Sequence, residues 1–250
     1  MPQNRVDVGS PKISFNALSL LKYLPGCIAC MDLENRFNYY INDECAYVNG
    51  YDSVDEMYGN KIEEVRCKAA EAAPMWIEQN QTVLKSNQLL KLLDIHPYRD
   101  DEIKILLSQK TPLFDDKHYP IATLFHGIEI NQNNLTKVFM RIAKLDKRFQ
   151  IKNNINHRSY YIGNSLKDSS LTNREIECLF YVVRGKTANQ IAKILFISKR
   201  TVETHIANIK SKLGCVTKSD LIDKAVTDNL INLLPESFFN NLQSGISIII

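Results

Sequence analysis

One segment decides how this chain folds: residues 171–213, LTNREIECLFYVVRGKTANQIAKILFISKRTVETHIANIKSKL. Its apolar residues recur at spacings of three and four, which predicts amphipathic helices. Thr172 stands three residues before Glu175, and Thr187 stands three residues before Gln190. This is the spacing of a capping box, in which two side chains satisfy free amides at a helix start. The segment therefore predicts helices that begin directly after Thr172 and Thr187.

A third helix is predicted directly after these two. Ser198 is a good N-cap residue, and Gly214 stands where a left-handed residue would end the helix. Only residues 196–198 separate it from the second helix, which predicts a tight helix-turn-helix. The apolar positions that keep the helical period form the predicted core: Ile176, Leu179, Phe180, Val183, Ile191, Ile194, Leu195, Val202, Ile206, Ile209 and Leu213.

The charges of the chain are divided unevenly along its length. Residues 135–250 contain 18 Lys and Arg against 9 Asp and Glu, a net charge of +9. Residues 1–134 contain 13 against 19, a net charge of −6, so the modest total of +3 hides the difference. A basic half that contains a helix-turn-helix indicates a polyanionic partner for that half.

The helix-turn-helix segment resembles the DNA-binding domain of LuxR/FixJ-type transcription regulators, without a gap over roughly 60 residues. The resemblance implies that the third helix enters the major groove of duplex DNA. It also implies a fourth helix, which residues 219–226 supply with apolar Leu221, Ile222 and Ala225. The matching residues are Thr172, Arg174, Glu175, Glu177, Leu179, Gly185, Lys186, Thr187, Ala192, Ile197, Ser198, Arg200, Thr201, Val202, Glu203, Thr204, His205, Asn208, Ile209, Lys212 and Leu213.

Helical spacing separates the faces of the third helix and predicts its contacts with DNA. Glu203 can accept from cytosine N4, Asn208 can pair with adenine, and Thr204 and Ala207 carry methyl groups that suit thymine. These four residues are the predicted base contacts. The predicted phosphate contacts are cations and hydroxyls that flank them: Lys186, Thr187, Lys199, Arg200, Thr201, Lys210 and Lys212.

Two residues of this helix keep a second interpretation. Glu203 could instead form an ion pair with Lys199 or Arg200, because these residues share a helix face. His205 lies beside the apolar stripe, so we interpret it as a packed structural histidine rather than a ligand or a catalytic group.

Length and composition bound the rest of the chain. Its 250 residues suffice for two domains, and a hydrophobic content of 44% allows each a buried core. No apolar run approaches the roughly 20 residues of a membrane helix, and the first residues lack the apolar core of a signal peptide. We therefore expect a cytoplasmic protein that makes no contact with a membrane, in which the six cysteines are reduced thiols.

The front half alternates short strands with small helices. Strands are predicted over residues 27–31, 36–41, 88–96, 102–109 and 121–130. Helical turns are predicted over residues 42–48, 53–58 and 72–86, the first of them capped by Asn42. This order resembles a PAS sensor domain, which implies five antiparallel strands with helices on one face. The matching residues are Leu24, Pro25, Gly26, Asp32, Phe37, Asn42, Gly50, Tyr51 and Lys110 to Asp115.

In relatives the PAS fold encloses a pocket that holds a small molecule, haem, flavin or nothing. The cofactor is therefore unknown, with a small-molecule ligand as the candidate. The Asn-Cys-Arg-Phe motif of blue-light flavin domains is missing, which argues against that photochemistry. The isolated His96, His118 and His126 are more plausible as structural residues than as haem ligands.

The remaining motifs do not indicate catalysis or a bound metal. Cys27 and Cys30 have the C-x-x-C spacing, but no second pair exists and a strand would place them on opposite faces. We interpret them as packing residues. No nucleophile with an adjacent base, phosphate loop or paired carboxylates is present, so we predict no enzyme.

A linking helix is predicted between the two halves, over residues 131–152. Its apolar residues repeat at alternating spacings of three and four, as in a two-heptad coiled coil, and they predict a homodimer. The alternative is an amphipathic helix that packs on its own sensor sheet. The predicted dimerisation residues are Leu135, Val138, Ile142, Leu145 and Phe149.

Together these patterns predict an α+β protein with six parts. They are an N-terminal extension (1–19), a PAS-like sensor (20–130) with a five-stranded antiparallel sheet, the linking helix (131–152), a linker (153–166), a four-helix LuxR-type DNA-binding domain (167–228) and a C-terminal tail (229–250). The predicted function is transcription regulation, in which the sensor modulates dimeric binding to double-stranded DNA. RNA polymerase is a further candidate partner.

Three other functions are alternatives. An autoinducer receptor would line its pocket with several aromatic and acidic residues, whereas Trp76 is the single tryptophan. A phosphoryl-accepting response regulator would need a parallel β/α alternation, which the predicted antiparallel strands do not provide. A protein-interaction module would use the helix-turn-helix to hold a protein, and a gel shift separates this from DNA binding.

Overall fold

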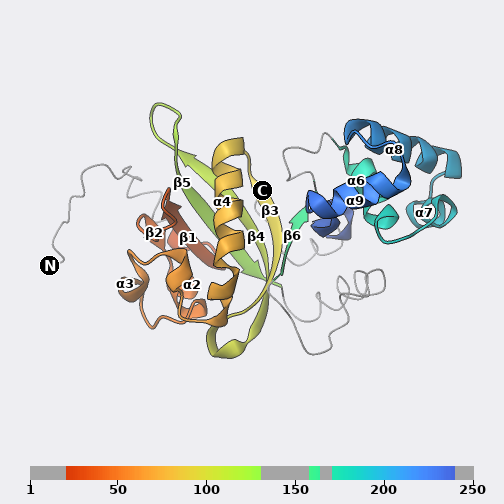
Figure 1. The fold of residues 1–250 in the computed structure, drawn as a ribbon. Helices are drawn as coiled ribbons and strands as arrows, with labels where there is room; N and C mark the ends of the chain where they lie inside the picture. Colours follow the sequence, from red (N-terminus) through yellow and green to blue (C-terminus); the bar gives the residue numbers. More distant parts are fainter. Residues whose placement is uncertain (1–20, 131–157, 164–170, 240–250) are drawn as a thin grey trace. The chain divides into compact units, whose positions relative to one another are not determined.

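The computed structural model describes residues 21–130, 158–163 and 171–239 (Figure 1). The chain divides into two compact units, Met1–Leu90 with Ile95–Glu129, and Lys91–Asp94 with Ile130–Ile250. The predicted linking helix, with Leu135, Val138, Ile142, Leu145 and Phe149, lies outside the described residues. No helix among the described residues is long and apolar enough to cross a membrane.

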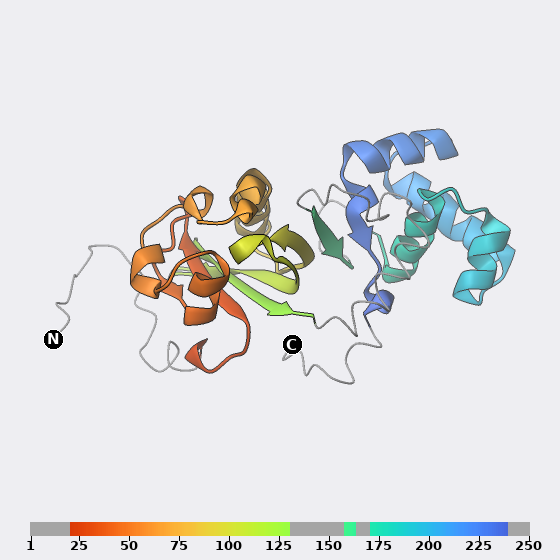
Figure 2. The same ribbon diagram turned by 90° about the horizontal axis from the view of Figure 1, so that it is seen from below.

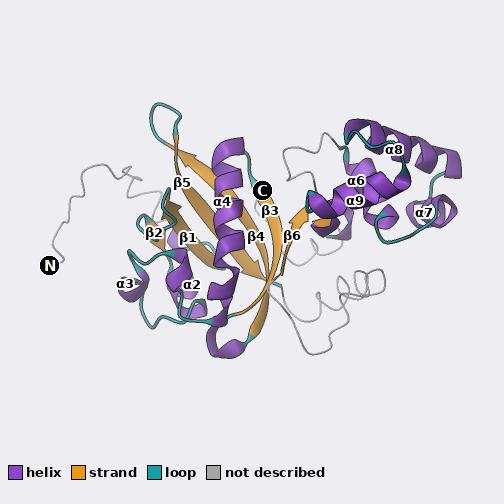
Figure 3. Cartoon of the chain, viewed as in Figure 1, coloured by secondary structure: helices purple, strands orange, loops and turns teal. Residues whose placement is uncertain are grey.

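The described strands belong to one sheet with the order β2-β1-β5-β4-β3-β6-β7. The prediction of a PAS-like sheet is confirmed, but the predicted number of five strands is wrong, because β6 and β7 extend it to seven. Figure 3 shows the strands in orange. Their bounds are β1 Cys27–Asp32, β2 Tyr40–Ile41, β3 Leu90–Pro97, β4 Ile103–Phe114, β5 Pro120–Glu129, β6 Arg158–Ile162 and β7 Leu233–Leu234.

The centre of the sensor sheet is a long antiparallel ladder. β5 pairs with β1 on one side and with β4 on the other. The β4–β5 register runs from Leu106 opposite Glu129 to Phe114 opposite Pro120. Strand β4 is therefore longer than the predicted 102–109, and Lys110 lies within it. Because side chains alternate along a strand, the inner face of β4 carries Lys110 into the core.

Strand β2 is shorter than predicted. A strand was expected over residues 36–41, but only Tyr40–Ile41 pairs with β1. The carboxylate of Asp32 accepts from two backbone amides of the following turn, and Asn35 is left-handed with a φ of 60°. The amide of Phe37 then donates to the carbonyl of Asn60 at 3.0 Å instead of to β1. These local bonds bend the chain away from the sheet.

Helices cover one face of the sensor sheet, with α4 crossing in front of it in Figure 1. Asn42 caps α2 by accepting from the amide of Cys45, as the sequence predicted. The cluster of buried side chains between helices and sheet includes Ala29, Phe37 and Leu106. The helices described within residues 27–130 are α2 Asp43–Val48, α3 Val54–Met57, α4 Ala73–Ser86 and the 3-10 turns η1 Ile62–Glu64, η2 Lys68–Ala72 and η3 Arg99–Asp101.

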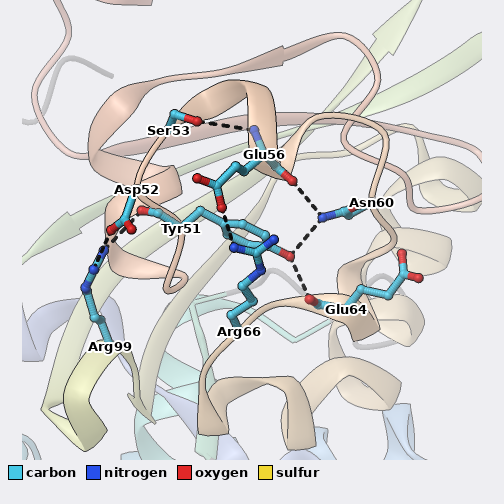
Figure 4. A network of polar contacts seen from close by, with 8 residues as sticks. All are labelled: Tyr51, Asp52, Ser53, Glu56, Asn60, Glu64, Arg66 and Arg99. Atoms are coloured by element: carbon cyan, nitrogen blue, oxygen red, sulfur yellow. Dashed lines mark hydrogen bonds and ion pairs between the residues drawn. The ribbon is translucent and has the colours of Figure 1, made fainter.

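A polar network around Tyr51 fixes the segment that carries α3 (Figure 4). The Tyr51 hydroxyl donates to the carbonyl of Glu64 at 2.6 Å and accepts from Nδ2 of Asn60 at 3.1 Å. The guanidinium of Arg66 lies 4.5 Å from the centre of the Tyr51 ring and forms an ion pair with Glu56. The network holds a buried aromatic ring at a position where its hydroxyl is fully bonded.

The second unit contains the four predicted helices, α6 Asn173–Val182, α7 Ala188–Leu195, α8 Lys199–Lys212 and α9 Lys218–Thr227. Capping boxes form at Thr172 and Thr187, and Ser198 accepts from the amide of Thr201. Gly214 is left-handed after α8, with a φ of 67°. The three helix starts and the end of α8 are therefore confirmed at the capping residues predicted from the sequence.

Two pieces of this unit have no counterpart in the sequence analysis. Residues 158–162, inside the predicted linker, form β6, which pairs in parallel with β7 from the predicted tail. The 3-10 turns η5 Leu230–Asn232 and η6 Glu236–Phe238 flank β7. Phe238 packs edge-to-face on Phe180 of α6 with the ring centres 4.8 Å apart. The start of the predicted tail is therefore part of the helical domain's core.

Candidate nucleic-acid interface

The two faces of α8 differ sharply in exposure. Val202 and Ile209 are fully buried, and Ile206 and Leu213 are partly buried beside them. His205 is also partly buried, at the edge of this stripe. The opposite face is formed by exposed side chains, which include all the predicted base contacts: Glu203, Thr204, Ala207 and Asn208. A helix anchored along one stripe presents the other face to a partner as a rigid surface.

The start of α8 brings cations and a hydroxyl to the same surface. Lys199, Arg200 and Thr201 form its first turn and are exposed. Thr187 is exposed at the N-terminus of α7, and Lys186 before it is half-buried. Helix N-termini favour anions because their free amides and the helix dipole point outward. The arrangement suits a phosphate backbone lying across both helix starts.

Glu203 forms the ion pair that the sequence analysis kept as an alternative. Its carboxylate lies 3.3 Å from Nζ of Lys199, one turn earlier on α8. Both side chains are more than half exposed, so the pair contributes little stability. Either group can leave the pair when DNA offers a better partner, which keeps base contact by Glu203 as a prediction.

The two lysines at the end of α8 have contacts within the protein. Nζ of Lys210 donates to the carbonyl of Val216 at 2.9 Å, and Nζ of Lys212 lies 2.7 Å from the carboxylate of Glu175. Lys212 therefore ties α8 to α6. Contact with phosphate stays a prediction for both lysines.

Glu175 connects the capping box of α6 to this ion pair. Its buried carboxylate accepts from the amide of Thr172 at 2.7 Å as well as from Lys212. Burial acts to raise the pKa of Glu175, but the hydrogen bonds from Lys212 and Thr172 outweigh burial and hold the pKa below its usual value. One carboxylate thus both begins α6 and positions the far end of α8.

We expect Lys212→Met to lower the free energy of unfolding of this domain by about 2 kcal/mol, because Glu175 loses a charged partner while staying buried. A carboxylate whose pKa is depressed by folding adds stability above its unfolded pKa and loses it as the pH falls. The difference in the free energy of unfolding between wild type and variant should therefore shrink below about pH 4. Urea unfolding at pH 7 and pH 3.5 measures this. An equal difference at the two pH values would contradict a stabilising ion pair between Lys212 and Glu175.

One predicted core residue is exposed. Ile194 keeps the helical period of α7 but is 38% exposed. Helix α7 is only eight residues long, and it packs against α6 and α8 along the side of Ile191 and Ala192. Ile194 lies outside that contact.

The sensor unit contains a second group of unusual residues, between α4 and the sheet. Gln79 and Asn80 lie on the buried side of α4, and Thr123 comes from the inner face of β5. The amide nitrogen and oxygen of Gln79, the amide oxygen of Asn80 and the hydroxyl of Thr123 have no hydrogen-bond partner. An unpaired buried polar atom costs about 1–3 kcal/mol. Such atoms in one core mark a place where a bound molecule could pair with them.

A buried lysine lies in the same core. Lys110 is 2% exposed and donates from Nζ to the backbone carbonyl of Trp76 on α4 at 3.1 Å. The indole nitrogen of Trp76 is 3.4 Å from Nε2 of His96, which is fully buried on β3. In the sequence, Lys110 stands out only as one of the residues that match a PAS domain, and His96 only as a histidine less plausible as a haem ligand than as a structural residue. No local signal could have shown that α4 brings these groups together.

The two cysteines of the C-x-x-C pattern are both buried in β1. Cys27 belongs to the core cluster under the helices. Burial raises the pKa of Cys30 to about 12, so its thiol is protonated and unreactive at neutral pH. Both residues lie in an apolar core, as packing residues do.

A family comparison bears on the helical domain. Residues 169–225 match the family described as bacterial regulatory proteins, luxR family. These residues form a LuxR-family helix-turn-helix domain. The exposed polar surface of α8 described above therefore lies in the helix that the resemblance assigned to the major groove. The resemblance to LuxR/FixJ-type regulators is confirmed for this region.

The relatives matched by the LuxR-type domain are transcription regulators. The chain is 38% identical over 77 residues to the transcriptional activator protein LuxR of Aliivibrio fischeri, 31% of either chain. The chain spans about a third of the length of the first curated relatives it matches.

Solved structures align with a larger share of the chain than the curated relatives do. The Vibrio cholerae VqmA dimer aligns with 91% of this chain and 94% of its own, at 27% identity and a TM-score of 0.48. The PAS domain of Bordetella pertussis BvgS aligns with 50% of this chain and 93% of its own, at 17% identity and a TM-score of 0.39.

Proposed function

We propose that this protein is a transcription regulator that binds double-stranded DNA through the exposed face of α8. The observation that carries the proposal is the contrast on that helix, where Val202 and Ile209 are fully buried and the opposite side is polar, cationic and exposed. The LuxR-family match to the same residues supports it. The base contacts are Glu203, Thr204, Ala207 and Asn208, and the phosphate contacts are Lys186, Thr187, Lys199, Arg200, Thr201, Lys210 and Lys212.

Fluorescence anisotropy of the full chain with labelled genomic fragments tests this function. Affinity should fall steeply as salt rises, because each phosphate contact releases counterions. Absence of binding at low salt would exclude DNA as the partner and leave the alternative of a protein-interaction module.

The regulator acts as a homodimer in this proposal. The basis is the two-heptad pattern over residues 131–152. A two-fold dimer favours related half-sites about one helical turn apart. Sedimentation of Val138→Asp and Ile142→Asp variants distinguishes a dimer seam from other packing. Lys137→Asp, at a position of the same segment outside the apolar repeat, is the control. We propose the cytoplasm as the location of the protein. RNA polymerase is proposed as a further partner.

The sensor unit binds a small molecule between α4 and the sheet. The unpaired atoms of Gln79, Asn80 and Thr123 offer both donors and acceptors, and the core around them is apolar. A neutral compound with its own donor and acceptor groups would satisfy these atoms without bringing an unpaired charge into the core. Signalling then requires the compound to bind one arrangement of the protein better than another.

We expect Gln79→Met with Thr123→Val to raise the stability of the ligand-free sensor by about 2 kcal/mol, since near-isosteric apolar groups replace unpaired polar atoms. The same change should abolish ligand retention. Thermal unfolding, with mass spectrometry of small molecules released from both proteins, measures the two effects. Gln88→Met, at an exposed site, is the control. A less stable double variant would show that these atoms are satisfied by the protein itself.

A further inference from the structure

Phe196 is the most exposed large apolar residue in the described part of the chain, at 94%. It caps the C-terminus of α7 in the left-handed conformation, with a φ of 55° and a ψ of 43°. Its amide donates to the carbonyl of Ala192, so the backbone is well bonded while the ring is in water. The side chain thus makes no contribution to the buried core of the domain.

A phenylalanine is an unfavourable choice for this backbone position. Left-handed geometry crowds the Cβ atom of a bulky residue, and glycine adopts the same turn without strain. Burial of the ring would compensate for the strain, but exposure rules out that compensation in the free protein. The folded domain alone therefore gives no reason for an aromatic ring here. The ring is instead expected to contact a partner.

The surroundings of the ring indicate which partner this is. Phe196 stands two residues before Ser198, the N-cap of α8, and three before Lys199. Lys193, Lys199 and Arg200 are exposed on either side of it along the chain. An apolar group among cations suits a surface that is anionic and also carries apolar patches. The backbone of duplex DNA is such a surface, because phosphates alternate with deoxyribose rings.

We propose that Phe196 is a DNA-contact residue whose ring packs on deoxyribose beside the phosphates held by Lys199 and Arg200. This inference rests on the proposed function, since it requires α8 to bind duplex DNA. The contact is sequence-independent, and it removes no counterion when it forms. It therefore adds affinity without adding to the salt dependence.

The full-length Phe196→Gly variant tests the contact, because glycine removes both the ring and the strain. We expect the unfolding temperature of the helical domain to rise while the affinity for duplex DNA falls about fivefold, as for burial of a small part of a ring. The slope of log affinity against log salt should be unchanged. Phe196→Asn, which also tolerates left-handed geometry, should weaken binding equally. Val226→Ala, at another exposed apolar residue (54%), should not weaken binding.

The outcomes separate this inference from the proposed function. Weaker binding at an unchanged salt slope, with a domain at least as stable as wild type, supports the contact. Equal affinity of wild type and both Phe196 variants overturns the contact and leaves the proposed function standing. A reduced slope of log affinity against log salt has the same consequence, because it would mean that the cations had moved. Absence of duplex binding by wild type itself overturns the proposed function first.

Discussion

The double variant Lys199→Ala and Arg200→Ala should bind duplex DNA roughly 30-fold more weakly than wild type at about 0.15 M salt. Both side chains are exposed in the first turn of α8, where a phosphate would also face the free amides of the helix start. Each lost phosphate contact should reduce the slope of log affinity against log salt by about 0.9. Anisotropy titrations at four salt concentrations give both numbers.

A charge-matched control distinguishes this contact from a general effect of net charge. Lys85 and Lys117 are exposed cations of the sensor unit, and replacing both by Ala removes the same charge. That variant should keep the affinity and the slope of wild type. Equal losses in both double variants would show that the protein attracts DNA only through its overall charge.

Gly50→Ala should destabilise the sensor unit by about 3 kcal/mol or more. Gly50 has a φ of 91°, and an added Cβ atom would lie 2.5 Å from the backbone oxygen of Arg66. The two segments are held together there, because the amide of Arg66 donates to the carbonyl of Asn49 at 3.0 Å. The neighbouring backbone therefore cannot move aside without loss of the network around Tyr51 (Figure 4).

Gly59 is the matched control, with a similar φ of 82° and its nearest neighbour 3.9 Å from an added Cβ. Gly59→Ala should cost only about 1 kcal/mol, the strain of a left-handed alanine. Urea unfolding followed by Trp76 fluorescence reports the sensor, which contains the single tryptophan. Equal costs at the two glycines would mean that the Arg66 backbone gives way.

The LuxR-type domain was predictable because its decisive signals are local. A capping box joins residues three apart, so Thr172 and Thr187 specify helix starts whatever surrounds them. The same holds for Ser198 and Gly214 at the ends of α8. Periodicity was less reliable, since Ile194 fits the helical repeat but lies outside the contact that buries its neighbours.

The sensor was predictable in outline and not in detail. Alternating apolar residues indicated its strands, but the bonds that Asp32 makes in the following turn shortened β2. The pairing of β6 with β7 joins Tyr161 to Leu233, residues too far apart in the chain for any local pattern to connect them. Strand partners of this kind depend on the packing of the whole domain.

The sequence by itself determined the helix-turn-helix, the exposed polar face of α8 and the order of the sensor strands, because caps and periodicity act within a few residues. Only the tertiary structure decided that Lys212 meets Glu175 and that Lys110 is buried under α4. It also decided that Gln79 and Thr123 lie unpaired in one core. Such juxtapositions arise from the packing of distant segments, and packing is a property of the folded chain as a whole.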